Sequence, residues 1–119
     1  MIALTSFWLD RVSFPIYNKI MNDPEIPEPI TFEWDEFNTT KIRLKHGIIP
    51  EEAEQPFFND YWAHFDETHS SAEKRYQLLG ANNTGRILFI IFTIRQDQIR
   101  IISARRASKK ERISYGQKI

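Results

Sequence analysis

The feature that most constrains the fold is a change of hydrophobic period after Phe57. Four segments in a row then carry the alternation, or the β-branched and aromatic composition, of strands. We expect these strands at residues 61–66, 74–80, 86–95 and 99–104. Short polar linkers between them predict hairpin turns, and therefore an antiparallel four-stranded meander. The third segment is apolar on both faces, which predicts a central strand covered on each side.

Two helices are predicted before the sheet. Asp35 is a typical N-cap residue, and the helix that follows should end at His46 because Gly47 is the preferred residue just past a helix. Pro50, followed by acidic residues, predicts a second short helix that ends near Pro56.

A third helix is expected after the sheet. Ser108 and Glu111 have the spacing of a capping box, and the helix should end near Gly116. Residues 31–34 are interpreted as a short additional strand. Together these elements predict an α+β fold, with two helices before a four-stranded antiparallel meander and one short helix after it.

The 119 residues suit one domain with an N-terminal extension. Prolines 24, 27 and 29 stand in a short acidic stretch that favours neither a helix nor a ladder. We therefore expect an extension at residues 1–30 and the folded domain at residues 31–119. The segment from Phe7 to Met21 is loosely amphipathic and can pack either on this domain or on a partner.

Nothing in the sequence favours export or membrane insertion. Asp10 and Arg11 interrupt the apolar N-terminus, so we expect no signal peptide. The longest apolar run, Ile87 to Phe92, is far shorter than the roughly 20 residues of a spanning helix. The chain has no cysteine. We expect a cytoplasmic protein that holds together by packing.

A net charge of zero hides a strong asymmetry. The first 84 residues contain seven basic and fourteen acidic residues, a balance of −7. From Gly85 onward nine basic residues face two acidic ones, a balance of +7. Any single cation can simply be a solvated surface residue, but the cluster as a whole indicates an anionic partner.

Common catalytic motifs are missing, among them GxGxxG, GxxxxGK[ST], HExxH and GxSxG. His64, Asp66 and His69 could meet at a strand end, but three histidines at such spacings are a weak signal for a metal. We therefore predict neither a metal site nor a cofactor.

The remaining polar residues are those that RNA cleavage requires. His46 can transfer a proton, and nearby Lys45 and Lys41 with Arg75 and Arg105 can hold phosphate oxygens. Further RNA contacts are expected from the basic C-terminal region, at Arg100, Lys109, Lys110 and Arg112.

Each leading candidate also has a structural alternative. Strand parity places Arg105 on the face of Ile99 and Ile101, where it could instead form an ion pair with an acid such as Glu73. His46 could only stabilise the C-terminal end of its helix.

Several motifs in series resemble the BrnT family, the ribonuclease half of BrnT–BrnA toxin–antitoxin systems. The resemblance covers about residues 31–116. In order, the motifs are Phe32-Glu33-Trp34-Asp35, Lys45-His46-Gly47, Pro50-Glu51-Glu52-Ala53, Glu73-Lys74-Arg75-Tyr76 with Gly80, Arg100-Ile101-Ile102-Ser103-Ala104-Arg105-Arg106, and Lys110-Glu111-Arg112 with Tyr115.

The resemblance implies a RelE-like fold and a metal-independent RNA endonuclease that inhibits translation. It also implies a hetero-oligomer with a BrnA-type antitoxin, whose ribbon-helix-helix part binds DNA, so that the toxin reaches DNA only indirectly. The catalytic positions carried over are Lys45, His46, Glu52, Arg75, Arg105, Arg106 and Tyr115.

One departure from the family pattern concerns the first helix. Many family members have lysine where this chain has Asn38 and asparagine where it has Ile42, so one cation is missing unless Lys41 substitutes. This departure keeps an alternative open, in which the protein is a non-catalytic RNA- or protein-binding module.

Overall fold

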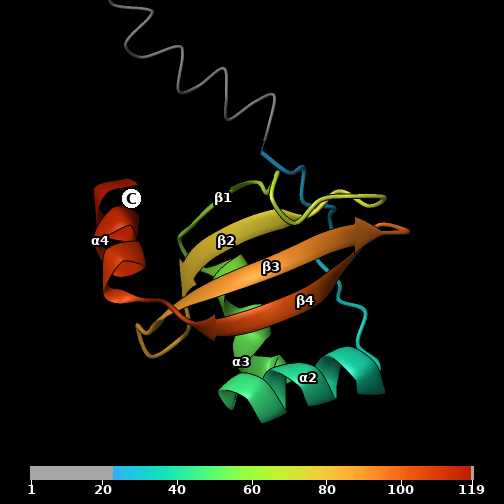
Figure 1. Ribbon diagram of the computed structural model, residues 1–119, viewed down its shortest axis with the longest axis horizontal. Helices are drawn as coiled ribbons and strands as arrows, with labels where there is room; N and C mark the ends of the chain where they lie inside the picture. Colours follow the sequence, from blue (N-terminus) through green and yellow to red (C-terminus); the bar gives the residue numbers. More distant parts are fainter. Residues whose placement is uncertain (1–22, 119) are drawn as a thin grey trace, which may run out of the picture.

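The computed structural model describes residues 23–118 and has a four-stranded antiparallel sheet within that range (Figure 1). The strands are β1 (Tyr61–Phe65), β2 (Tyr76–Ala81), β3 (Ile87–Arg95) and β4 (Gln98–Arg106). They lie in the sheet in sequence order, so the predicted meander is confirmed. The helices are α2 (Glu36–His46), α3 (Pro50–Glu54), the short 3-10 helix η1 (Gln55–Phe58) and α4 (Lys109–Lys118).

The ends of α2 follow from its capping residues. The backbone N–H of Asn38 donates to Asp35 Oδ1 at 3.1 Å, and the backbone N–H of Asp35 donates to Asn38 Oδ1 at 2.8 Å. These two bonds satisfy donors that a helix N-terminus leaves without partners. At the other end Gly47 has φ of 67°, a left-handed conformation that glycine adopts without steric strain.

The core lies between the sheet and the helices α2, α3 and η1. Ile42, Ile48, Ala53 and Phe57 reach it from the helical side, and all are almost completely buried. The strands contribute a row of similar residues, namely Ala63, Leu78, Leu88, Ile90, Phe92, Ile99, Ile101 and Ala104. At η1 the approach is so close that a Cβ on Gly80 would lie 3.0 Å from Pro56 Cβ.

The second face of the sheet has no helix across it within the described part of the chain (Figure 1). β3 is an inner strand, as predicted, with β2 and β4 on its two sides. The predicted cover on each side of β3 is only partial on this second face, where Thr93 is buried as well. There Ile91 is buried among neighbouring side chains, while Phe89 is half-buried.

A β-bulge corrects the predicted orientation of the arginines on β4. Ser103 pairs with Ile91 while Ile101 pairs with Phe92, so Ile102 is an extra residue. Beyond the bulge the alternation is reversed. The prediction that Arg105 shares the face of Ile99 and Ile101 is therefore wrong, because Arg105 pairs with Phe89 on the open face.

The segment before α2 lies along the outer edge of β4. Its predicted strand is reduced to one parallel bridge between Phe32 and Ile99. The backbone N–H of Glu33 donates to the carbonyl of Ile99 at 2.8 Å. Ile26 and Ile30 also pack against the core, so packing begins before residue 31. The predicted amphipathic segment from Phe7 to Met21 lies outside the described residues.

Candidate active site

A cavity of about 300 Å³ lies on the open face of the sheet, beside the C-terminal end of α2. It brings together five side chains that the sequence analysis selected from three separate regions. Its lining consists of Lys41, Lys45, His46, His69, Arg75, Phe89, Ile91, Ile102, Ser103 and Arg105. Cationic and imidazole groups thus surround an apolar floor.

The helix α2 supplies one wall of the cavity. Lys41 and Lys45 are four residues apart, so they lie on one stripe of the helix, and His46 follows at its last position. Asn38 lies one turn earlier but is 2% exposed. Its amide nitrogen donates to the carbonyls of Glu33 at 3.2 Å and Ile101 at 3.1 Å. Position 38 therefore does not line the cavity, and Lys41 and Lys45 are the cations that α2 supplies to this wall.

Arg105 rises from β4 and is held on two sides. Its two terminal nitrogens donate to the two carboxylate oxygens of Glu111 at 2.8 and 2.9 Å. Its guanidinium carbon lies 4.4 Å from the centre of the Phe89 ring, a cation–π contact. The hydrogen bonds between Arg105 and Glu111 raise the pKa of Arg105 and lower the pKa of Glu111.

The partner of Arg105 differs from the acid suggested by the sequence. Glu73 does not bind Arg105, because it pairs with Arg95. Glu111 is also the capping-box residue of α4, where it accepts a hydrogen bond from the backbone N–H of Ser108 at 2.8 Å. A guanidinium has five N–H donors; Glu111 accepts from two and the carbonyl of Arg106 from a third at 3.2 Å, which leaves two donors for a phosphate.

The loop between β1 and β2 supplies Arg75 and His69. Its neck is closed by a backbone hydrogen bond from Asp66 to the carbonyl of Arg75, at 2.8 Å. The hydroxyl of Ser70 donates to the carbonyl of Asp66 at 2.7 Å and accepts from the N–H of Arg75 at 2.9 Å. These bonds fix the loop backbone from which both side chains project.

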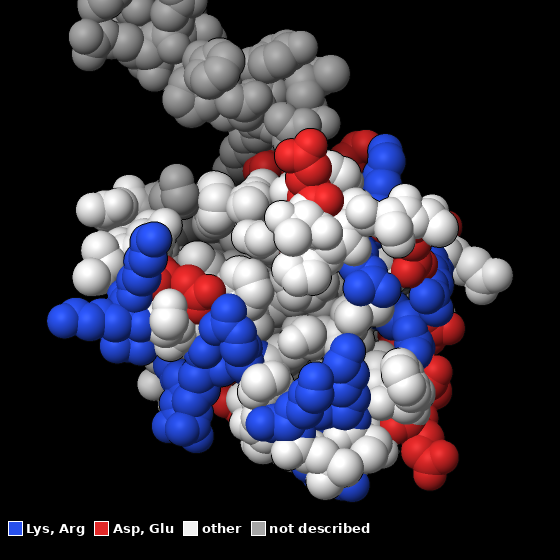
Figure 2. Space-filling view, viewed as in Figure 1, with Lys and Arg blue, Asp and Glu red and all other residues white. Residues whose placement is uncertain are grey.

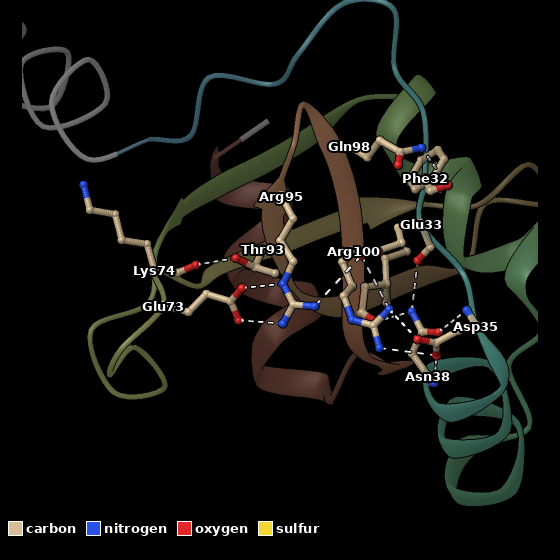
Figure 3. Close-up of polar contacts among 11 residues, drawn as sticks. Phe32, Glu33, Asp35, Asn38, Glu73, Lys74, Thr93, Arg95, Gln98 and Arg100 are labelled. Carbon is tan, nitrogen blue, oxygen red and sulfur yellow. Dashed lines mark hydrogen bonds and ion pairs between the residues drawn. The ribbon is translucent and has the colours of Figure 1, made fainter.

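One ion pair and one hydrogen bond join this loop to the hairpin of β3 and β4 (Figure 3). Arg95 donates to the two carboxylate oxygens of Glu73 at 2.6 and 3.1 Å. The hydroxyl of Thr93 donates to the carbonyl of Lys74 at 2.7 Å. The hydrogen bond from Arg95 to Glu73 lowers the pKa of Glu73 and raises the pKa of Arg95. The loop is thereby anchored near the cavity.

Arg100, which was predicted to contact RNA, is a β4 residue that forms ion pairs at the start of α2 (Figure 3). It is 7% exposed, and its guanidinium lies 3.0 Å from Asp35 Oδ2 and 3.6 Å from Glu33 Oε1. The hydrogen bond from Arg100 lowers the pKa of Asp35. Arg100 thus joins β4 to the N-cap of α2 and does not line the cavity.

Six other predicted residues also lie outside the cavity lining. Asn82 donates to Glu52 at 2.9 Å, and Tyr115 donates to the carbonyl of Asp60 at 2.9 Å. Arg106 is exposed on the face opposite Arg105. The remaining three belong to α4, where Lys109 and Lys110 are exposed and Arg112 donates to the carbonyl of Ala107 at 2.9 Å.

Sequence reasoning missed His69 and Ser103 as lining residues. His69 was considered only as a metal ligand, although the spacing Asp66-X-X-His69 in a polar loop allows the aspartate to reach the imidazole. Within residues 23–118 no group of three or more His, Cys, Asp or Glu side chains could hold a metal ion. None of the helices in the same range combines the length and apolar composition that a membrane span requires.

Basic side chains are concentrated around this face of the molecule. Figure 2 shows Lys and Arg over α4, over α2 and near the end of β4, with uncharged surface between them. Acidic groups in the same view lie mostly at its margins. This distribution is that of a surface for an anionic ligand.

Comparison with known proteins identifies the family and the fold. A family model described as "Ribonuclease toxin, BrnT, of type II toxin-antitoxin system" matches residues 34–111. The crystal structure of the Brucella abortus ribonuclease toxin BrnT is similar, with a TM-score of 0.50 and 24% sequence identity. That match covers 67% of this chain and 99% of the Brucella chain, and shows the fold. No curated protein sequence matches significantly. Since the family model spans well over half of the chain, this protein belongs to the BrnT family of ribonuclease toxins from type II toxin–antitoxin systems.

Proposed function

We propose that this protein is a metal-independent RNA endonuclease that inhibits translation in the cytoplasm and is neutralised by a BrnA-type antitoxin. The observation that carries the proposal is the lining of the cavity. Lys41, Lys45, Arg75 and Arg105 meet there with His46, and no carboxylate is among the lining residues. Such a site attracts a phosphodiester and can supply both charge stabilisation and a proton carrier.

The chemistry follows from what an RNA strand contains. Its 2′-hydroxyl can attack the adjacent phosphorus once a base removes the proton, and His46 is the residue proposed for that role. Negative charge then grows on the phosphate oxygens, where the two arginines and two lysines stabilise it. Arginine suits this task because its planar fork matches phosphate oxygens. The cations carry out the charge stabilisation that a metal ion supplies in other nucleases.

The test is cleavage of RNA by purified protein in the presence of EDTA. We expect activity to persist and the products to end in 2′,3′-cyclic or 3′-phosphates, because the nucleophile belongs to the substrate. DNA has no 2′-hydroxyl and should be spared. Loss of activity on chelation, or efficient cutting of DNA, would contradict the mechanism. RNA binding without cleavage would favour the alternative of a non-catalytic binding module.

The antitoxin is proposed to cover the cavity and the adjoining basic surface of β4 and α4 in a hetero-oligomer. An acidic segment of the antitoxin would occupy the phosphate site, and its ribbon-helix-helix part would provide the only contact with DNA. Charge complementarity should make association slower as salt is added. A complex that leaves Arg105, Lys109 and Arg112 open would contradict this placement.

A further inference from the structure

A second imidazole lies in the cavity and is bound to a buried carboxyl group. His69 Nδ1 lies 2.6 Å from Asp66 Oδ2. The side chain of Asp66 is 1% exposed, whereas that of His69 is 52% exposed. An aspartate in the interior therefore holds a histidine that faces the space lined by His46, Arg75 and Arg105.

The carboxyl group of Asp66 is itself held firmly. Its other oxygen, Oδ1, accepts the backbone N–H of His69 at 3.2 Å, and its backbone is fixed by Ser70 and Arg75 at the neck of the loop. Because Oδ2 accepts from Nδ1, the ring carries hydrogen on Nδ1. This leaves Nε2 as the nitrogen that exchanges a proton.

The two imidazoles have different immediate neighbours. His46 follows Lys45 directly and lies on the same helix as Lys41, so its charged neighbours along α2 are cations. His69 instead contacts the buried carboxyl group of Asp66, an arrangement that orients an imidazole for proton transfer. A neutral imidazole suits a base, and a doubly protonated imidazole suits an acid.

Resting on the proposed function, we propose that His69 is the general acid of RNA cleavage and that Asp66 is its positioning residue. The 2′-oxygen bonds to phosphorus as its proton passes to His46. The bond from phosphorus to the 5′-oxygen breaks, and this oxygen takes the Nε2 proton of His69. The products are a 2′,3′-cyclic phosphate and a 5′-hydroxyl end, and proton exchange with water resets both histidines.

His69 shares the cavity with charged groups from several elements. Asp66 belongs to its own loop, and the cavity adds cations from α2, β4 and the end of the loop. These groups are Asp66, Lys41, Lys45, His46, Arg75 and Arg105. With His46 as base and His69 as acid, a pH–rate profile of the wild-type protein should have an acidic and a basic limb, and the basic limb should belong to the acid catalyst.

The decisive experiment compares two substrates. One is an ordinary oligoribonucleotide, and the other carries sulfur in place of the bridging 5′-oxygen at the cleavage site. A thiolate leaves without protonation, so a general acid is not needed for the second substrate. His69→Gln should slow cleavage of the ordinary substrate by about 100-fold or more. It should slow the sulfur substrate by less than about 5-fold, and remove the basic limb of the pH profile.

Two matched variants complete the design. His46→Gln removes the proposed base, so it should slow both substrates to a similar degree. His64→Gln makes the same change on β1, where the ring lies against Trp62 with a centroid distance of 4.2 Å. Because His64 does not line the cavity, this variant should cleave both substrates at the wild-type rate. Melting temperatures identify any variant that fails to fold.

Asp66 needs a separate readout because it also shapes its loop. Asp66→Asn preserves an acceptor for the backbone N–H of His69 but removes the negative charge. We expect a loss of about 10-fold or more on the ordinary substrate and recovery on the sulfur substrate. A purely structural role would slow both substrates equally.

The possible failures can be told apart. If the wild-type protein does not cut RNA, the proposed function itself fails. If it cuts RNA and folded His69→Gln cuts the ordinary substrate equally well, only the role of His69 is overturned. Equal losses on both substrates would also overturn the role of general acid, since such a defect does not depend on the leaving group.

Discussion

Asn38 is a polar residue whose side chain is buried. It is 2% exposed, and its amide group satisfies the carbonyls of Glu33 and Ile101 as well as the backbone N–H of Asp35. Against the family pattern, this position counted as a missing cation. The structure gives it a different task, because a lysine could not make the same set of bonds in this buried place.

Replacing Asn38 with alanine should therefore destabilise the protein strongly. One buried and one partly buried carbonyl would lose their donor, and each unsatisfied group costs about 1–3 kcal/mol, so the free energy of unfolding should fall by about 2–4 kcal/mol. Urea unfolding measures this change. Asn59→Ala is a matched control, because Asn59 also donates to a carbonyl, that of Ala81, but is exposed. Equal effects of the two variants would show that burial is not the cause.

Arg105 combines a structural bond with a place in the cavity, and two substitutions can separate these roles. Arg105→Ala removes the cation, so the rate of RNA cleavage should fall about 100-fold or more. Glu111→Gln keeps the cation and can still cap α4, since glutamine also serves in a capping box. This variant should retain cleavage within about 10-fold. Rates per folded protein, with melting temperatures, test the pair, and equal losses in both variants would assign Arg105 to structure alone.

What the sequence could predict about these residues depended on the range of the interactions. The Asp35 cap and the Gly47 stop were predicted because a cap is a local pattern of a few residues. The orientation of Arg105 was not, because the bulge at Ile102 has no signature among similar apolar neighbours. The pairing of Arg95 with Glu73 joins residues 22 positions apart, and no local pattern selects one acid from several.

At the scale of elements, the loop between β1 and β2 carries two cavity residues and is anchored mainly near its C-terminal end. The clearest anchor is the pair of Glu73 with Arg95, supported by the bond from Thr93 to the carbonyl of Lys74. The sequence analysis selected Arg75 for the site, but as part of a strand, and it did not select His69. Such loops are positioned by tertiary contacts, which periodicity does not encode.

Glu73→Gln should loosen this loop with little effect on the fold. The pair is partly exposed, so the melting temperature should change by only a few degrees, about the effect of a surface ion pair. The cleavage rate should fall more clearly, by about 3- to 10-fold, because His69 and Arg75 lose their fixed placement. Faster amide exchange at residues 66–75 should accompany it. An unchanged rate with faster exchange would mean that the loop does not take part in catalysis.

At the scale of the molecule, the charge asymmetry of the sequence predicted the anionic partner but only part of the site. Arg105 comes from the basic C-terminal region, whereas Lys41, Lys45 and Arg75 come from the acidic part of the chain. The fold brings them together because α2 packs beside β4 and leaves one sheet face open. Linear charge counts cannot reveal this, since the antiparallel register decides which residues meet.

Three arginine–carboxylate pairs link separate elements of the molecule. They predict how the free energy of unfolding depends on pH. Hydrogen bonds from Arg100, Arg95 and Arg105 lower the pKa values of Asp35, Glu73 and Glu111 respectively. A carboxyl group whose pKa is lower in the folded state stabilises that state at every pH above its unfolded pKa, which is about 3.9 for Asp and 4.3 for Glu. This contribution is lost as pH falls through the lowered folded pKa.

The free energy of unfolding, measured by urea titration, should therefore show no loss from these groups between pH 7 and about 5, and should decrease steadily below about 4.5. A variant combining Asp35→Asn, Glu73→Gln and Glu111→Gln should be less stable at pH 7 and should have a shallower slope below pH 4.5. A slope as steep as that of the wild-type protein would show that other carboxyl groups govern unfolding by acid.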